Sequence, residues 1–173
     1  MRGAGREGCK RCEVLGAPRL LFLDEPTTGL DPFLRQSFYE TVAALRGRGV
    51  TTVLSSHALS ELETRVDKIV VLHDGNALVS GTLESLRAMA RLPTIFRLRL
   101  RNGLSGTVPA IFEGLAAGHV AVDGAVELTC AADHKIEVLR RAQAIDGLSD
   151  IEILSPSLDQ LYAAFLQDRM TAP

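Results

Sequence analysis

The sequence predicts an α/β fold in which part of a parallel sheet is followed by a smaller α+β unit. The first observation is a pair of short apolar runs, residues 20–24 and 50–55, separated by residues 33–46 with the apolar spacing of a helix. A strand, a helix and a second strand in this order form a βαβ unit, whose strands lie parallel. The second observation is a change after Pro93 to alternating apolar and basic residues, which is typical of a half-exposed strand.

Composition is that of an ordinary globular chain. Of its 173 residues, 46% are apolar and 23% are charged. No apolar run approaches the roughly 20 residues of a membrane helix, and no signal peptide is visible, so a cytoplasmic protein is expected. The net charge of −2 gives no indication of nucleic-acid binding. The three cysteines favour reduced thiols, and Cys9 and Cys12 lack the second pair that a zinc site needs.

The most informative stretch is residues 19–32, RLLFLDEPTTGLDP. Its apolar run fits a strand buried on both faces, and the run ends in Asp24 and Glu25. Carboxylates are costly to bury without a cation or hydrogen-bond donors, so this strand is expected to present them to a ligand. Asp31 and Pro32 then predict an N-cap followed by proline at the first helical position. An isolated acidic pair would more simply be a solvated turn, and only the longer string favours a site.

The elements after this stretch follow from local signals. Asp74-Gly75 is a two-residue hairpin signal, and Thr82 is placed to cap a helix. Residues 94–173 read as strand, helix, two strands, helix and strand, the ferredoxin-like arrangement, followed by a last helix. The expected elements are strand 50–55, helix 58–65, strands 67–72 and 77–79, helix 83–92, strand 96–101, helix 108–116, strands 118–122 and 126–131, helix 135–145, strand 151–154 and helix 158–166.

Side-chain positions are also predicted for the second part of the chain. The strand after Pro93 should bury Phe96, Leu98 and Leu100 and leave three arginines, Arg97, Arg99 and Arg101, on a solvated face. The amphipathic helix over 135–145 should turn Ile136, Leu139 and Ala142 inward, and Ser157 should cap the last helix.

The string DEPTTGLDP resembles the Walker B motif and the following D-loop of ABC-type ATPases. The resemblance implies the C-terminal part of a P-loop NTPase sheet over residues 17–92, with a ferredoxin-like domain over 94–173. Residues 1–16 do not fit the signature segment that the family has in this place, so an aberrant or truncated N-terminal segment is expected there, as a frame-shifted or misassigned start would produce.

Topology and the resemblance point to the same residues. The ends of two parallel strands meet at one edge of a sheet, so Asp24, Glu25 and His57 should lie together. Taken alone, His57 would be an ordinary residue at a strand-to-helix turn. The resemblance implies ATP and Mg²⁺ as cofactors. It also implies that Asp24 helps to hold Mg²⁺, that Glu25 polarises the attacking water, and that His57 contacts the γ-phosphate. The D-loop residues Gly29, Leu30 and Asp31 would face the nucleotide of a partner ATPase.

Several motifs of the family do not occur in the printed sequence. It contains no G-x-x-x-x-G-K-[ST] string, and neither a glutamine loop nor an intact signature segment. The chain as written is therefore expected neither to bind ATP tightly nor to hydrolyse it. Steady phosphate release that Glu25→Gln abolishes would contradict this expectation.

The family resemblance also implies partners and a location. An ABC ATPase pairs with a second ATPase and with a permease, which would hold this chain at the cytoplasmic face of the inner membrane. The segment SSHALSELETRVDKIVVLHDGNALVSGTLESLR, with RLPTIFRLRLR and SPSLDQLYAAFL, is most similar to the copper-processing ABC ATPase of nitrous oxide reductase maturation. Two alternatives stay open, namely an exporter of drugs, lipids or ions and a non-catalytic regulatory or ligand-binding module.

A copper site is a further hypothesis for the second part of the chain. With Asp123-Gly124 as the turn, His119 and Cys130 would be diagonal neighbours on one hairpin face, with His134 close by. The competing interpretation is a small core cysteine and two surface histidines.

Overall fold

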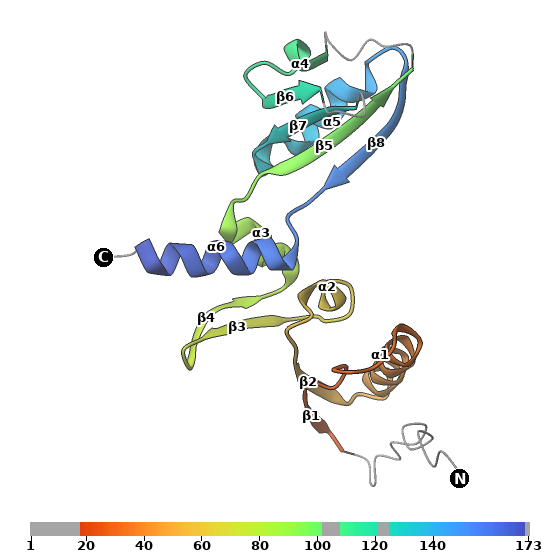
Figure 1. The fold of residues 1–173 in the computed structure, drawn as a ribbon, viewed down its shortest axis with the longest axis vertical. Helices are drawn as coiled ribbons and strands as arrows, with labels where there is room; N and C mark the ends of the chain where they lie inside the picture. Colours follow the sequence, from red (N-terminus) through yellow and green to blue (C-terminus); the bar gives the residue numbers. More distant parts are fainter. Residues whose placement is uncertain (1–17, 102–107, 121–124, 172–173) are drawn as a thin grey trace, which may run out of the picture. The chain divides into compact units, whose positions relative to one another are not determined.

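A computed structural model describes residues 18–101, 108–120 and 125–171 (Figure 1). The chain divides into two compact units, Met1–Ala58 and Leu59–Pro173. The expected segment 1–16, with Cys9 and Cys12, and the turn Asp123-Gly124 lie outside the described residues. The elements are β1 (Leu20–Asp24), α1 (Pro32–Gly47), β2 (Thr51–Ser55), α2 (Leu59–Leu62), β3 (Ile69–His73), β4 (Asn76–Gly81), α3 (Leu83–Ala90), β5 (Thr94–Leu100), α4 (Val108–Ile111), β6 (Ala116–Val120), β7 (Val126–Cys130), η2 (Ala132–His134), α5 (Lys135–Gln143), β8 (Leu148–Leu154) and α6 (Leu158–Thr171).

The first unit is the predicted βαβ arrangement. Strands β1 and β2 pair in parallel, with Asp24 opposite Ser55. Helix α1 begins as the sequence predicts, because the Asp31 carboxylate accepts a hydrogen bond from the Leu34 N–H at 2.9 Å and Pro32 occupies the first turn. Beyond its other end, Gly49 adopts a φ of +82°, the left-handed conformation that favours glycine.

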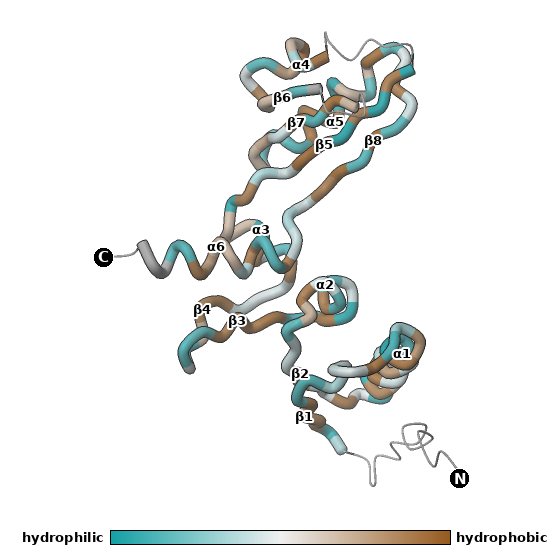
Figure 2. Tube along the Cα trace, viewed as in Figure 1, coloured by the Kyte–Doolittle hydropathy of each residue, from teal (hydrophilic) through white to brown (hydrophobic). Residues whose placement is uncertain are grey.

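The prediction that the first strand is buried on both faces is wrong for the described chain. One face of the strand pair is half-buried, whereas Leu20, Phe22 and Val53 on the other face are 50%, 70% and 46% exposed. A single helix, α1, lies beside the pair in the described part of this unit, so the other face is uncovered (Figure 1). The apolar residues of β1 that caused the expectation are visible as a brown segment in Figure 2.

The second unit begins with a helix and a hairpin. β3 and β4 pair antiparallel, and the turn between them has positive φ angles at both central residues, +48° at Asp74 and +74° at Gly75. This is the two-residue turn that matches the twist of a hairpin, as the Asp-Gly pair predicts. Helix α3 is capped by Thr82, whose hydroxyl accepts a hydrogen bond from the Ser85 N–H at 3.2 Å.

Four antiparallel strands in the order β6-β7-β5-β8 form the sheet of the ferredoxin-like part. This order, with α4 and α5 as the crossovers, is that of the βαββαβ arrangement, so the fold-class prediction is confirmed. Phe96 and Leu98 are fully buried in its core, and Leu100 packs against it. On the opposite face Arg99 is exposed, as predicted, whereas Arg97 lies 3.5 Å from Glu127 and is only 30% exposed.

The inward face of α5 agrees with the prediction at Leu139 and Ala142 and differs from it at Ile136. Ile136 is 64% exposed, whereas Val138 and Ala142 are fully buried. At 3.6 residues per turn, positions 138 and 142 lie within roughly 40° of each other, and position 136 lies roughly 200° before position 138. The face is therefore set by the i, i+4 pair, and the expected inward position of Ile136 is wrong.

Helix α6 closes the second unit by packing against α2 and α3. Its start is a reciprocal capping arrangement, in which the Ser157 hydroxyl accepts from the Gln160 N–H and the Gln160 side chain accepts from the Ser157 N–H. Leu158 and Leu161 are buried, as are Leu62 and Leu86 on the two helices that α6 packs against.

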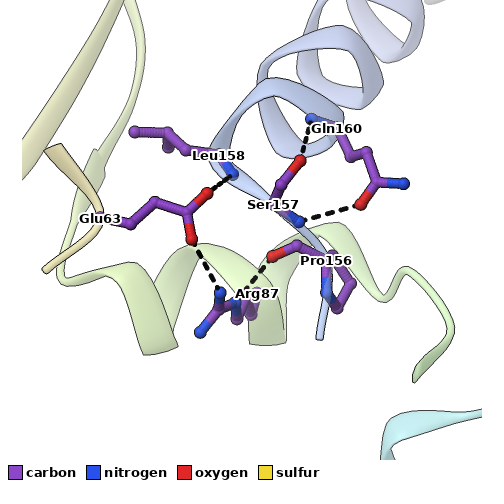
Figure 3. A network of polar contacts seen from close by, with 6 residues as sticks. All are labelled: Glu63, Arg87, Pro156, Ser157, Leu158 and Gln160. Atoms are coloured by element: carbon purple, nitrogen blue, oxygen red, sulfur yellow. Dashed lines mark hydrogen bonds and ion pairs between the residues drawn. The ribbon is translucent and has the colours of Figure 1, made fainter. Parts of the chain in front are cut away.

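A polar network fixes the start of α6 (Figure 3). The Glu63 carboxylate accepts a hydrogen bond from the Leu158 N–H at 2.6 Å and lies 3.5 Å from the Arg87 guanidinium, whose Nε donates to the Pro156 carbonyl at 2.9 Å. A carboxylate at a helix N-terminus satisfies a free N–H and interacts favourably with the helix dipole. In the part of the chain that the structure describes, no helix is both long enough and apolar enough to span a membrane.

Candidate functional site

The site lies where β1 and β2 end, within the first unit. β1 ends at Asp24 and is followed by Glu25, while β2 ends at Ser55 and is followed two residues later by His57. Because the strands are parallel and in register, both ends lie at the same edge. The structure thus brings together the three residues that the sequence placed at this edge.

Direct contacts join these residues. The Nδ1 atom of His57 lies 2.8 Å from a carboxylate oxygen of Glu25, and the Thr28 hydroxyl donates to the same oxygen at 3.2 Å. The Ser55 hydroxyl donates to the Asp24 carboxylate in a short hydrogen bond and accepts from the Glu25 N–H at 3.0 Å. One hydroxyl group at the end of β2 therefore contacts both acidic residues.

The backbone at Glu25 is in an unusual conformation. Its φ is +44°, in the left-handed region that side chains other than glycine seldom adopt. Such a conformation costs on the order of 1–3 kcal/mol and persists only where surrounding interactions hold it. Here the hydrogen bonds to Ser55 and Thr28 and the contact with His57 hold the residue.

The predicted D-loop forms a turn with its own hydrogen bonds. Gly29 has a φ of +75°, and the Leu30 N–H donates to the Thr27 carbonyl at 3.1 Å. The Leu30 carbonyl in turn accepts from the Arg35 guanidinium at 3.0 Å, while Asp31 caps α1. These contacts define the shape of the turn, and its role toward a partner's nucleotide stays a prediction.

The site is open to solvent and rich in carboxylate and hydroxyl oxygen atoms. The His57 side chain is 77% exposed and that of Glu25 is 37% exposed. Within residues 18–101, 108–120 and 125–171, no three His, Cys, Asp or Glu side chains are grouped so as to enclose a metal ion. Mg²⁺ typically keeps several waters and takes one or two carboxylates plus substrate phosphates, so the Asp24 and Glu25 carboxylates fit this ion better than a metal that needs a full protein cage.

Ser55 is the site residue that the sequence reasoning missed. In the sequence Ser55 is only the end of an apolar run, and a serine in that place forms no distinctive pattern. Its signal is the strand register, because a parallel pair that begins with Leu20 opposite Thr51 places Ser55 opposite Asp24. The register becomes available only from the structure.

The hypothesis of a copper site at His119, Cys130 and His134 is wrong. The register of β6 and β7 pairs His119 with Glu127, whereas Cys130 lies opposite Ala116 on the buried face. A shift of one residue from the expected pairing moves a side chain to the other face of the sheet, and His119 lies 3.6 Å from Glu127 instead.

A separate hollow in the second unit contains Cys130 and His134. It has a volume of about 370 Å³ and is lined by residues 114–117, 129–131 and 134. The His134 Nδ1 atom lies 3.2 Å from the Leu115 carbonyl oxygen, so this ring is held by the backbone. Burial raises the pKa of the Cys130 thiol, an effect that Lys135 opposes and Asp133 reinforces. The thiol therefore stays protonated at neutral pH.

Comparisons with known proteins agree with the motif. The family described as "AAA domain, putative AbiEii toxin, Type IV TA system" matches residues 13–63, which include Asp24, Glu25 and His57. The doxorubicin resistance ATP-binding protein of Mycobacterium tuberculosis is 32% identical over 166 residues, 91% of this chain and 50% of that protein. The linearmycin resistance ATP-binding protein of Bacillus subtilis is 28% identical over 169 residues, 90% of this chain and 53% of that protein.

A solved structure described as the ATP-binding subunit of an ABC transporter is 34% identical and covers 42% of this chain and 30% of that chain, with a TM-score of 0.41. The site lies at the acidic end of a strand in an α/β fold. The two relatives reported above are both named as ATP-binding proteins. The chain is a homologue of ATP-binding subunits of ABC transporters, among them proteins named as drug-resistance ATP-binding proteins. It spans about half the length of the curated relatives it matches.

Proposed function

We propose that this chain supplies the magnesium and water side of an ATP site in the ATP-binding subunit of an ABC exporter. The observation that carries the proposal is the edge at which Asp24, Glu25 and His57 meet, with 2.8 Å between His57 and Glu25. Homology to ATP-binding subunits supports it, because the matched stretch contains these residues. An acid pair and an imidazole at one sheet edge suit phosphoryl transfer, which depends on positioning and charge stabilisation.

Each residue has a role in this proposal. Asp24 would hold Mg²⁺ through the carboxylate oxygen that does not accept from Ser55, and the ion would supply positive charge beside the phosphates. Glu25 accepts a hydrogen bond from the attacking water and so orients it. His57 donates a hydrogen bond to an oxygen of the γ-phosphate, where charge develops during transfer. The turn at Gly29, Leu30 and Asp31 faces the nucleotide of the partner ATPase.

The phosphate-binding loop is the missing part of this site. The 173 residues contain no G-x-x-x-x-G-K-[ST] string, whose backbone N–H groups and lysine would hold the phosphates. We therefore infer that the printed chain alone does not bind ATP tightly, and that residues outside it complete the nucleotide site.

The names of the relatives support a proposal about the transported substrate. Those reported above are named for resistance to doxorubicin and linearmycin, so an exporter of a drug-like compound is the function we propose. The relatives reported above are not named for copper, so they give no support to a copper-processing role. The proposed partners are a membrane permease, which holds the chain at the cytoplasmic face of the membrane, and a second ATPase subunit.

Calorimetric titration with Mg-ATP tests the proposal. The printed chain alone should give no measurable heat of binding at micromolar concentrations. Fusing the half of the M. tuberculosis relative that this chain does not match ahead of residue 17 should restore binding, and Asp24→Asn in the same fusion should weaken it in the presence of Mg²⁺. A folded fusion that binds no nucleotide would contradict the proposal and favour a non-catalytic binding module.

A further inference from the structure

We propose that Ser55 is a positioning residue that holds Asp24 and Glu25 in their working arrangement. The inference extends the proposed function and rests on it. Among the side chains that the structure describes, that of Ser55 forms hydrogen bonds with both acidic residues. Its hydroxyl donates to the Asp24 carboxylate and accepts from the Glu25 N–H.

A hydroxyl group is suited to this double contact. It carries one donor and two acceptor positions, so it can donate to a carboxylate and accept from an N–H at the same time. Donation to an ionised group is a strong hydrogen bond, and it polarises the hydroxyl oxygen so that it accepts more strongly. One side chain on β2 therefore fixes both the rotamer of Asp24 and the backbone of Glu25.

The effect on Glu25 reaches the proposed chemistry. Its left-handed backbone, with a φ of +44°, needs interactions that hold it, and the N–H bond to Ser55 is one of them. In this conformation the Glu25 carboxylate lies 2.8 Å from His57. Water can replace the hydrogen bonds of Ser55 at this exposed edge, but a mobile water does not fix the direction of either carboxylate.

The chain offers matched variants for a test. Ser55→Thr keeps a hydroxyl group, and Ser55→Val introduces a side chain with nearly the shape of threonine but without the hydroxyl. Threonine and valine are both β-branched and suit a strand. The neighbouring Ser56 is a control, because its hydroxyl accepts from the Ala58 N–H at 3.1 Å and has no described contact with the acidic pair.

The first measurement is hydrogen exchange of the Glu25 amide by NMR in the 173-residue chain. Ser55→Val should accelerate this exchange about tenfold, as loss of a hydrogen bond implies, while Ser55→Thr and Ser56→Ala should leave it within about twofold of the wild type. Equal exchange rates in the Val and Thr variants would overturn the proposal, whether or not the chain takes part in ATP hydrolysis.

The second measurement uses the fusion that completes the nucleotide site. Ser55→Val should lower kcat about tenfold with KM for ATP nearly unchanged, and Ser55→Thr should restore kcat, a pattern that general destabilisation would not give. If the fusion hydrolyses ATP and the Val variant keeps its kcat, the positioning role is refuted although the proposed function stands. If the wild-type fusion is folded but inactive, the proposed function fails, while the exchange of the Glu25 amide still decides whether Ser55 holds the acidic pair.

Discussion

Replacing Glu63 should loosen the C-terminal helix without unfolding the rest of the second unit. The Glu63 carboxylate accepts from the Leu158 N–H at 2.6 Å and lies 3.5 Å from the Arg87 guanidinium (Figure 3). Its side chain is 21% exposed and that of Arg87 is 29% exposed. Both partners would lose an acceptor in a partly desolvated place if the carboxylate were removed.

The expected magnitude follows from these contacts. A hydrogen bond to a charged group contributes about 1.5–3 kcal/mol, whereas a partly exposed ion pair at the long separation to Arg87 adds less than about 1 kcal/mol. Solvent access reduces the sum, so we expect Glu63→Ala to lower the free energy of opening α6 by about 2 kcal/mol. Glu63→Gln keeps an acceptor for the Leu158 N–H and should lower it by about 1 kcal/mol.

Native-state hydrogen exchange of the α6 amides, read by mass spectrometry, measures this free energy. A loss of about 2 kcal/mol corresponds to exchange about 30-fold faster in Glu63→Ala, and about 1 kcal/mol to about fivefold in Glu63→Gln. Glu84→Ala is the matched control, because Glu84 is an exposed carboxylate in the first turn of α3. Equal exchange of α6 in the Glu63→Ala and Glu84→Ala variants would refute the reasoning.

Three further predictions concern stability. Phe96→Ala, at a fully buried position, should lower the free energy of unfolding, measured in urea, by about 3–5 kcal/mol. Phe22→Ala, at a position 70% exposed, should change this free energy by less than about 0.5 kcal/mol. Asp31→Ala should cost about 1 kcal/mol and accelerate exchange in α1, while Asp31→Ser should restore the cap. Burial raises the pKa of Cys130 above its ordinary value of 9.0. Above pH 9 the unfolded chain therefore loses a proton that the folded state still holds. The resulting contribution to stability is complete below pH 9 and is lost as the pH rises further. Urea unfolding under reducing conditions at pH 8 and pH 10 should show this loss in the wild type, and Cys130→Ala should reduce it.

Local signals in the sequence were sufficient for much of the fold. The Asp31 cap, the Asp74-Gly75 turn and the Thr82 cap each depend on a few neighbouring residues, and all three form as predicted. The edge site was also predictable, because a βαβ unit places the ends of its two parallel strands, and so Glu25 and His57, at the same edge of the sheet.

The predictions that were wrong or missing concern contacts between segments that are distant in the sequence. One residue of register separates the expected from the observed pairing of His119, and that one residue moves the side chain to the other face of the sheet. The contact of Ser55 with Asp24 depends on register in the same way. Burial of Phe22 was expected from its apolar neighbours, but burial depends on what packs over the strand, which a local pattern does not contain.

ATP hydrolysis by the fusion protein tests the central claim most directly. If Asp24, Glu25 and His57 form the magnesium and water side of the site, the fusion should release phosphate in the presence of Mg²⁺. Glu25→Gln should then abolish turnover while ATP still binds, since it replaces the carboxylate that orients and polarises the attacking water with a neutral amide. Turnover that persists at the wild-type rate in the Glu25→Gln variant would contradict the account.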